Sequence, residues 1–296
     1  MTGNNGFIGR YLVERLLRMG HTVIGCDLRS NNFTNLNCYF HKADFTDQKE
    51  THRLFSQHKP DHCFHVGAIA DVNYAREHYI ETTKTNVFGT GVIAEMCRKY
   101  DSFLTYVSTC CVYGNTSIYP THENAPLKPT EIYGLTKLAG ENLVKGYQQL
   151  YDLQSNILRY STVYGPGMRK ALAVYVFLSK ALKKEALPIH GDGAHTRSYI
   201  FIEDLVDATM EAMKVKNEVI NIAGDKAVST LTLAESCWRI VNSDEEAVLK
   251  FVPDRPRNVK REDVDIRKAH TLLNWSPTTP IEDGLKTTYD WMRKTL

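Results

Sequence analysis

The sequence lacks a run of about 18 apolar residues, the length that a membrane-spanning helix needs. It also lacks an excess of one charge: 36 basic and 34 acidic residues leave a net charge of +2, so no broad field would attract nucleic acid. Its seven cysteines form no CxxC pair, and no secretory signal precedes them. These absences predict a cytoplasmic protein with reduced thiols that binds neither nucleic acid nor membrane.

Low-complexity tracts, repeats and Pro/Gly-rich linkers are absent as well, so a chain of 296 residues is expected to pack as one body. Strand-like runs alternate with helical stretches in the first half, at 21–27, 38–44, 61–68, 103–108 and 155–160. The alternation predicts an α/β fold with a doubly wound parallel sheet. Beyond residue 160 the rhythm loosens, which favours a first domain at 1–162 and a smaller α/β domain at 163–296, with some segments returning to the first.

The stretch TGNNGFIG opens the chain with Gly3, Gly6 and Gly9, and it runs into an amphipathic helix whose first residues are Phe7 and Ile8. Glycines at this spacing permit a sharp turn, close approach of a pyrophosphate and tight packing of the helix on the sheet. A simple turn and helix cap is the alternative. Only two residues precede the turn, so we expect a missing or shortened first strand.

Asp27 ends the next strand-like run, 18 residues after Gly9. This is close to the interval of about 20 residues at which an acidic side chain binds an adenosine ribose. A carboxylate there repels a 2′-phosphate and favours NAD over NADP, although the nearby Arg29 leaves some room for NADP. An aspartate that only caps a turn is the other interpretation.

Tyr133 and Lys137 are four residues apart in a helical segment, so the phenol and the ammonium share one face. The preceding strand-like run brings Ser108 and Thr109 to the carboxyl edge of the sheet, where ligands bind in open α/β folds. A neighbouring ammonium would stabilise a phenolate and help the tyrosine act as a base. A plain surface pair on a helix remains the alternative interpretation of Tyr133 and Lys137.

Taken in order, the motifs TGNNGFIG, KADFTD, FHVGA, KTNVFGT, STCCVYG, YGLTK, LRYSTVYGP, GDGAHTRSYIFIEDL and RPRNV…LLNWSP span nearly the whole chain. This set resembles the extended short-chain dehydrogenase/reductases of the NAD-dependent nucleotide-sugar epimerase/dehydratase family. The resemblance implies a Rossmann-type NAD-binding domain followed by a sugar-nucleotide domain, and a homodimer formed by the helices after residue 73 and the helix that contains Tyr133.

The resemblance also implies a role for each matching residue. Thr109, Tyr133 and Lys137 would be catalytic. The expected cofactor-binding residues are Gly3, Gly6, Phe7, Ile8, Gly9, Asp27, Asp44, Phe45, Ala68, Asn86, Ser108, Tyr133 and Lys137. The expected substrate-binding residues are Thr109, Cys110, Cys111, Thr162, Arg169, Arg197 and Arg255, of which the last two match arginines that bind a diphosphate. No metal is expected. Without the motifs around them, Arg197 and Arg255 would be read as surface charges.

Cys110 and Cys111 stand where the related 4,6-dehydratases carry an Asp-Glu pair. A thiol, whose pKa is about 8.5, is a poorer proton donor than a carboxylic acid, so dehydration is disfavoured. Adjacent residues on one strand point to opposite faces, which argues against a disulfide. We expect the two cysteines to be packing residues, with Cys111 as a substrate contact or weak base in the alternative.

The simplest remaining reaction is inversion at C4 of a UDP-sugar by transient oxidation, with NAD retained. Thr162 and Arg169 resemble residues of UDP-glucuronate 4-epimerases, but Lys170, Ala171 and Leu172 depart from that subgroup. UDP-glucose/UDP-galactose and UDP-glucuronate/UDP-galacturonate therefore both stay open. A dehydratase or 4-keto-sugar reductase is the alternative enzyme, and a sensor or RNA-binding relative is the alternative without catalysis.

Overall fold

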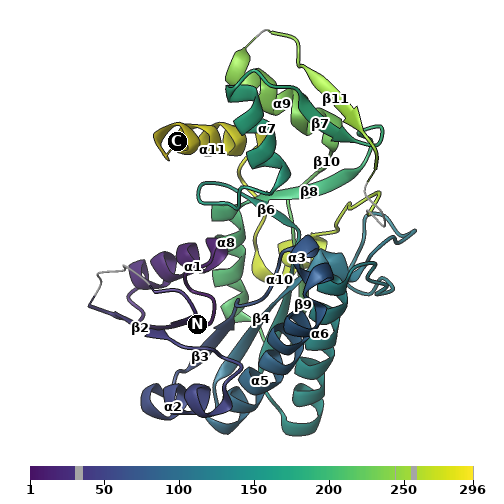
Figure 1. Ribbon diagram of the computed structural model, residues 1–296. Coiled ribbons are helices and arrows are strands. Elements are labelled where there is room, and N and C mark those ends of the chain that lie inside the picture. The colour runs from purple at the N-terminus through teal and green to yellow at the C-terminus, as the bar shows by residue number, and fades with distance from the viewer. Residues whose placement is uncertain (31–35, 244, 255–258, 296) are drawn as a thin grey trace.

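The computed structural model describes residues 1–30, 36–243, 245–254 and 259–295. One parallel sheet forms the lower part of the molecule in Figure 1. Its strands are β1 (Val23–Asp27), β2 (Cys38–Lys42), β3 (His62–His65), β4 (Phe103–Thr109), β5 (Ser155–Tyr160) and β9 (Val219–Ile222). They pair in parallel as β2 with β1 and as β3, β4, β5 and β9 in that order.

Thr2 joins these two groups of strands, because it bridges both Cys26 in β1 and His65 in β3. Its N–H donates to the Phe64 carbonyl at 3.0 Å, and the Cys26 N–H donates to the Met1 carbonyl at 2.9 Å. The first strand expected before the glycine turn is thus reduced to this bridge, which places the turn in the middle of the sheet.

Helices cover both faces of the sheet, as the connections of a parallel sheet require. On one side α1 (Phe7–Arg18) packs against α8 (Ile202–Glu211); on the other, α5 (Gly89–Lys99) packs against α2 (Gln48–His58) and α6 (Ile132–Tyr151). Shorter elements connect them: α3 (Val72–Glu77), α4 (Tyr79–Thr83), the π-helix η1 (Lys84–Phe88) and the 3₁₀ turn η2 (Cys110–Val112). The doubly wound α/β fold is therefore confirmed.

The upper part in Figure 1 is smaller and mixed. Its elements are β6 (Thr162–Tyr164), α7 (Ala173–Leu182), β7 (Leu187–His190), β8 (Thr196–Phe201), β10 (Ala227–Ser229), α9 (Thr230–Asn242), β11 (Leu249–Val252) and α11 (Ile281–Thr295). β8 pairs with β6 in parallel and with β10 antiparallel, while β7 pairs with β11. The chain returns to the lower sheet through α8, the 3₁₀ turn η3 (Ala212–Lys214), β9 and α10 (Arg267–Leu273).

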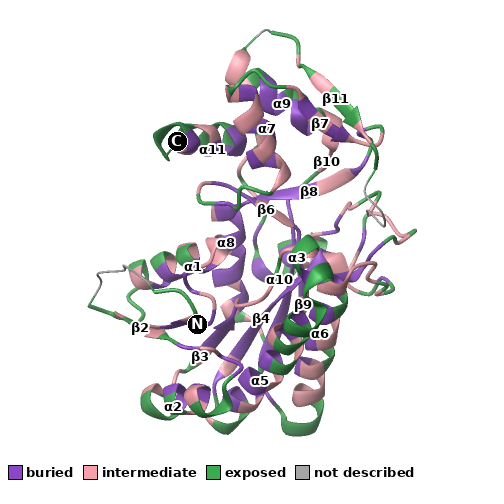
Figure 2. Ribbon diagram, viewed as in Figure 1, coloured by how far each residue is buried: buried purple, intermediate pink, exposed green. Residues whose placement is uncertain are grey.

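A continuous hydrophobic core links the two parts. It includes Leu12 of α1, Leu158 of β5, Leu178 of α7 and Trp238 of α9, all of them buried. Every residue of β5 is buried as well, which is typical of a central strand covered on both faces. Figure 2 shows this burial along the sheet and under α7, α8 and α9. Because the two parts share this core, packed helices and strands hold them together.

Candidate active site at the carboxyl edge of the sheet

The glycine turn has the shape that a bound pyrophosphate requires. Gly3 has a φ of +69°, and a Cβ at this position would lie 2.6 Å from the Gly67 nitrogen. A Cβ on Gly9 would collide with the Gly3 carbonyl oxygen. Gly6 is the N-cap of α1 and offers no capping side chain. The first N–H groups of the helix, at Phe7 and Ile8, are therefore suited to binding an anion.

Asp27 lies beside this turn at the end of β1. Its carboxylate accepts hydrogen bonds from the Asn5 N–H and the Arg29 N–H, both at 3.0 Å. The capping role considered above is therefore present. Two N–H bonds leave part of the acceptor capacity of a carboxylate free, so the same group can also bind ribose hydroxyls. The Arg29 side chain is 70% exposed and lies 3.8 Å from Asp27.

Three of the other predicted cofactor residues follow β2 and β3. Asp44 accepts a hydrogen bond from the Thr46 N–H at 2.8 Å, and the buried Phe45 ring packs edge-on against His65. Ala68 follows Gly67, whose N–H donates to the Thr2 hydroxyl at 3.1 Å. These contacts fix the loops on either side of the glycine turn.

Two further predicted cofactor residues, Asn86 and Ser108, use their side chains within the protein. The Asn86 amide oxygen accepts from the Ile69 N–H, and its nitrogen donates to the Ile69 carbonyl and the Thr136 hydroxyl at 3.0 Å. The Ser108 hydroxyl donates to Glu141 at 2.6 Å. Asn86 therefore braces the loop after β3 against α6, and Ser108 reaches a cofactor only through its backbone.

Thr109 and Tyr133 meet at the end of β4. The Thr109 hydroxyl accepts a hydrogen bond from the Cys111 N–H at 3.2 Å and interacts with the Tyr133 phenol. Burial raises the pKa of Tyr133, whereas the hydrogen bond with Thr109 and the charge of Arg169 lower it. The phenol therefore rests protonated and needs further positive charge before it can act as a base.

Lys137 is buried one turn further along α6, with its ammonium 4.1 Å from the centre of the Tyr106 ring. Burial lowers the pKa of Lys137 to about 7, and the Glu141 carboxylate partly opposes this effect. The sequence predicted a fully charged ammonium that stabilises the phenolate. In the structure the ammonium is costly to keep charged, because water is excluded from it.

The two cysteines lie in the 3₁₀ turn η2 and not on a strand as the sequence suggested, because β4 ends at Thr109. The buried Cys110 thiol donates to the Arg159 carbonyl at 3.5 Å. Burial raises the pKa of Cys110 well above its usual value and also raises the pKa of Cys111. Both thiols are free and stay protonated, which disfavours proton abstraction by either of them.

The predicted substrate residues occupy the space above this turn. Thr162 begins β6, and Arg197 lies in β8, close enough to Cys111 for its charge to lower the thiol pKa. Arg169 lies near Tyr133 and contacts Asp71 at 3.3 Å and the Ala70 carbonyl at 3.3 Å. Arg255 lies outside the described residues.

This geometry can be set against known proteins. A model of the NAD-dependent epimerase/dehydratase family matches residues 1–223. The chain belongs to this family. A putative UDP-glucose 4-epimerase of Methanocaldococcus jannaschii is 34% identical over 99% of this chain and 97% of its own length. More distant matches, at about 30% identity, include dehydratases and a decarboxylase as well as 4-epimerases.

Solved structures agree with the family assignment. The UDP-glucose 4-epimerase of Thermotoga maritima with UDP-glucose has a TM-score of 0.93 and 32% identity, over 99% of this chain and 98% of that one. The UDP-glucuronic acid 4-epimerase of Bacillus cereus, in complex with UDP-glucuronic acid and NAD, has a TM-score of 0.92 and 30% identity over 100% and 98%. This epimerase/dehydratase chain therefore has an NAD-dependent enzyme fold, and the glycine turn fits that cofactor.

Sequence reasoning missed a buried polar network beneath the site, which we call the floor network: Ser108, Tyr113, Glu141, Arg159 and Asn221. Glu141 and Arg159 are paired at 2.7 Å with almost no exposure. Arg159 also donates to the Tyr113 hydroxyl at 2.9 Å, which donates to Asn221 at 2.6 Å. Glu141 could have been found, because it follows Lys137 by four residues on the face of α6 that carries the site.

Glu262 was missed as well, and nothing in its sequence context signals a role. Its side chain lies among Thr162, Arg197 and the two cysteines of η2. Burial raises the pKa of Glu262, whereas the Arg197 charge and hydrogen bonds from Ser198 and Thr162 lower it. It is a carboxyl group in the part of the site where the sequence led us to expect only thiols.

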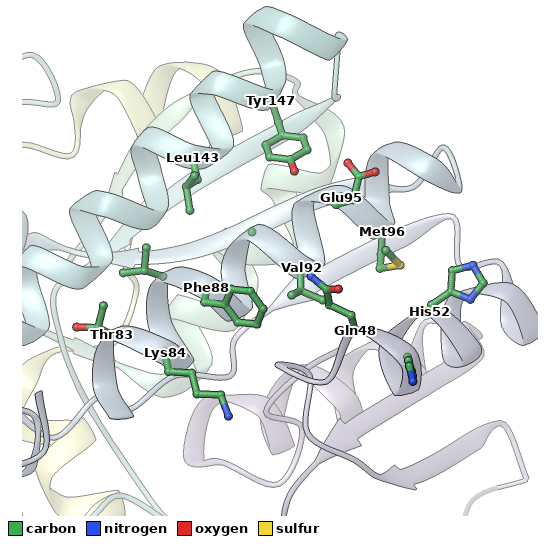
Figure 3. Close-up of a pocket in the computed structure, with 13 residues that line it drawn as sticks. Gln48, His52, Thr83, Lys84, Phe88, Val92, Glu95, Met96, Leu143 and Tyr147 are labelled. Carbon is green, nitrogen blue, oxygen red and sulfur yellow. The ribbon is translucent and has the colours of Figure 1, made fainter. Parts of the chain in front are cut away.

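A groove with a volume of about 950 Å³ lies away from this chemistry, on the outer surface of α2, η1, α5 and α6. Figure 3 shows Phe88, Val92, Leu143 and Tyr147 among its lining residues. The Phe88 side chain is 47% exposed. The groove is therefore an apolar outer surface, separate from the proposed active site.

Proposed function

We propose that this epimerase/dehydratase chain is a UDP-sugar 4-epimerase. It would interconvert UDP-glucose and UDP-galactose, or UDP-glucuronate and UDP-galacturonate, by transient oxidation at C4. The observation that carries the proposal is the contact of the Thr109 hydroxyl with the Tyr133 phenol, at the edge of the sheet where the glycine turn opens. A binding module has no need of this pair beside a buried lysine.

The residues that would hold the cofactor are those of the glycine turn, together with Asp27, Asp44, Phe45 and Ala68. NAD, when bound, supplies the acceptor and then the donor of the hydride at C4. Asn86 supports this role indirectly, since its amide ties the loop after β3 to Thr136 on α6. Lys137 lies buried on the same helix, where its ammonium could donate to hydroxyl groups of a bound ligand.

Tyr133 would move the proton. Its phenolate accepts the proton of the sugar 4-hydroxyl directly or through Thr109, and returns it when C4 is reduced from the other face. The resting phenol has a raised pKa, so the step needs the positive charges of Lys137 and of the oxidised cofactor close to it. Thr109, fixed by the Cys111 N–H, would hold the 4-hydroxyl in line with the phenol.

The cysteines of η2 favour epimerisation over dehydration. Loss of water across C5 and C6 needs an acid and a base that exchange protons near neutral pH. Burial raises the pKa of both Cys110 and Cys111, so neither thiol meets this need. Epimerisation at C4 asks for no such pair, because Tyr133 serves both half-reactions.

The upper part of the molecule would hold the sugar nucleotide. Arg197 is half-buried in β8, and its charge acts on Cys111 of η2. A guanidinium in this position suits a diphosphate. Arg169 is the residue placed to meet a sugar carboxylate, but Asp71 already pairs with it. We keep residues 1–162 as the proposed NAD-binding domain and 163–296 as mainly the substrate domain, with β9 returning to the lower sheet.

We also propose that the chain forms a homodimer through the groove of Figure 3. The helices α4 and α6, which contribute to its lining, also carry exposed apolar side chains: Ile80 at 72%, Leu135 at 53% and Leu150 at 74% exposure. Exposed apolar surface of this kind is typical of protein–protein interfaces. Phe88→Glu should yield a monomer by sedimentation velocity, whereas Met19→Glu, at a side chain that is 52% exposed on α1, should not. A monomeric wild type would contradict this proposal.

No helix among the described residues is long and apolar enough to cross a membrane. Because the seven cysteines are free thiols, we propose a cytoplasmic location.

The function is tested by product analysis. The purified protein is denatured and the released nucleotide identified, and fresh protein is incubated with UDP-galactose or UDP-galacturonate while C4 is followed by NMR. We expect NAD and inversion at C4 without net cofactor consumption. A 4-keto-6-deoxy product would identify a dehydratase instead, and net consumption of NAD(P)H would identify a reductase.

A further inference from the structure

The segment that begins at residue 259, after residues 255–258, which the structure does not describe, is held firmly against the sugar side of the site. The Glu262 N–H donates to the Thr196 carbonyl at 3.1 Å, and the Val264 N–H donates to the Ser198 hydroxyl at 3.2 Å. Arg261 bridges Thr196 in β8. The backbone of residue 262 is therefore fixed, and its side chain is directed by the sheet β6–β8–β10 rather than by a flexible loop.

The hydrogen-bonding capacity of the Glu262 carboxyl is only partly used. The carboxyl hydrogen-bonds with Thr162 and with the Ser198 backbone, while its Oε1 atom is buried and has no hydrogen-bond partner among the described residues. A buried carboxyl oxygen without a partner is costly to the folded protein unless a ligand satisfies it. Burial raises the pKa of this carboxyl above its usual value.

Two proposed substrate contacts, Arg197 and Cys111, lie near this carboxyl. The charge of Arg197 acts on Glu262, and Glu262 in turn acts on Cys110 and Cys111. Cys111 is bound to Thr109, the proposed contact of the sugar 4-hydroxyl. Glu262 therefore lies along the interval between the proposed diphosphate site and the reacting carbon, which is the space of the sugar ring.

During inversion at C4, both edges of the sugar ring would come close to Glu262. The 4-keto sugar must present its second face while C4 returns to Tyr133, and C1 stays tethered to the diphosphate. Turning about this axis exchanges the edge that carries C2 and C3 with the edge that carries C5 and C6. A hydroxyl on either edge can donate to Glu262, whereas a C6 carboxylate can pair with it only when Glu262 is protonated.

Resting on the proposed 4-epimerase function, we propose that Glu262 is a specificity-determining residue that accepts a hydrogen bond from a neutral hexose and disfavours a hexuronate. The preferred substrates are then UDP-glucose and UDP-galactose. Specificity of this kind arises from an unfavourable charge pair with the competing ligand as much as from a contact with the preferred one.

The selection depends on pH. The titratable or charged groups that face Glu262 are Arg197 and Tyr199 of β8 and the two thiols of η2. Burial raises the pKa of Tyr199, Cys110 and Cys111, so these three groups stay protonated. As pH rises through the raised pKa of Glu262, the carboxyl ionises, so discrimination against a hexuronate should increase with pH.

The test uses Glu262→Gln, which keeps the shape of the side chain and cannot ionise, and Asp263→Asn as the matched control. Asp263 is the neighbouring residue and pairs with Arg261 outside the site at 2.7 Å. Dissociation constants of UDP-galactose and UDP-galacturonate are measured by calorimetry from pH 5.5 to 8.5 on NAD-loaded protein, and NAD content verifies folding. Turnover of both sugars is measured in parallel.

For wild type and Asp263→Asn we expect tighter binding of UDP-galactose, with a preference that grows about tenfold per pH unit above the pKa of Glu262. For Glu262→Gln we expect a preference at least about tenfold smaller at pH 8 and independent of pH. Equal preference in wild type and Glu262→Gln, or a wild-type preference for UDP-galacturonate, would overturn the inference. Failure of both sugars to invert at C4, with the binding preference intact, would overturn the proposed function and leave the role of Glu262 standing.

Discussion

Two polar regions border the proposed sugar site, and they are built in opposite ways. The floor network below Thr109 is fully satisfied: its buried groups bond to one another, down to the Glu141–Arg159 pair at 2.7 Å. By contrast, Ser161, Thr196 and Glu262, which follow β5, begin β8 and lie against β8, each have a buried side-chain oxygen without a partner among the described residues; we call them the unpaired trio.

This difference indicates different roles for the two regions. A satisfied buried network makes one arrangement rigid, whereas unsatisfied buried atoms are retained at a cost to stability. We infer that the floor network fixes β4, β5 and α6, and that the unpaired trio keeps its hydrogen-bonding capacity for a ligand. Substitutions below the site should therefore change stability, and those above it should change recognition.

The largest expected effect is a loss of turnover. It comes from the Tyr133 phenol, which belongs to neither region. Tyr133→Phe removes the proposed proton acceptor and should lower turnover by about 10²–10⁴-fold. NAD content and the melting temperature should stay close to those of the wild type, because the hydroxyl belongs to neither region. Product formation by NMR is the measurement, and a fully active variant would exclude the mechanism.

Breaking the floor network should cost the most stability. Arg159→Leu leaves the Glu141 carboxylate buried without its partner, which should lower the free energy of unfolding by about 3–5 kcal/mol. Chemical denaturation measures the loss. Arg98→Leu is the control: its pair with Glu95 is exposed and should contribute less than about 1 kcal/mol. Similar losses in the two variants would mean that the floor network is not a structural support.

The buried ammonium of Lys137 predicts how the stability of the protein changes with pH. Burial lowers the pKa of Lys137 to about 7 from 10.5, so between these values the unfolded chain binds a proton that the folded chain does not. The stability of the NAD-free protein should therefore rise with pH across this window, by at most about 1.4 kcal/mol per unit from this group. Lys137→Met should lose this part of the slope. An unchanged slope in the variant would show that Lys137 stays protonated.

The smallest effects should distinguish the two regions most directly. Ser108→Ala removes a hydrogen bond to Glu141 and should cost about 1–3 kcal/mol, whereas Thr196→Val removes a hydroxyl without a described partner and should be nearly neutral. We expect Thr196→Val to raise the KM for the sugar nucleotide while the unfolding curve stays in place. The reverse order of stabilities would remove the contrast between the floor network and the unpaired trio.

Local sequence spacing predicted the parts of the site that lie on one element or one turn. The glycines precede α1 directly, and Tyr133 and Lys137 are separated by one helical turn, so their geometry follows from the chain itself. The strands of the first half also lie where the apolar runs predicted them. The end of β4 was predicted less well, because nothing local shows that the backbone turns into a 3₁₀ conformation at Cys110.

The parts that escaped prediction depend on contacts between distant segments. Glu262 reaches the site only because its strand-like segment lies against β8, more than sixty residues away in the chain. The amide of Asn86 is consumed by Ile69 and Thr136, which no spacing rule indicates. Such partners are chosen by packing, and their role is visible only once the sheet and the segments above it are assembled.

The bridge at Thr2 has a consequence for the order in which the sheet comes apart. Among the described residues, Thr2 is the one that bridges both β1 and β3 across the middle of the sheet, whereas β4 and β5 pair over six residues. A narrow seam thus divides the β1–β2 pair, which carries Asp27, from the rest of the sheet. A dinucleotide that contacts both the glycine turn and Asp27 would link the two sides of this seam. Cofactor binding would therefore raise the stability of the folded enzyme.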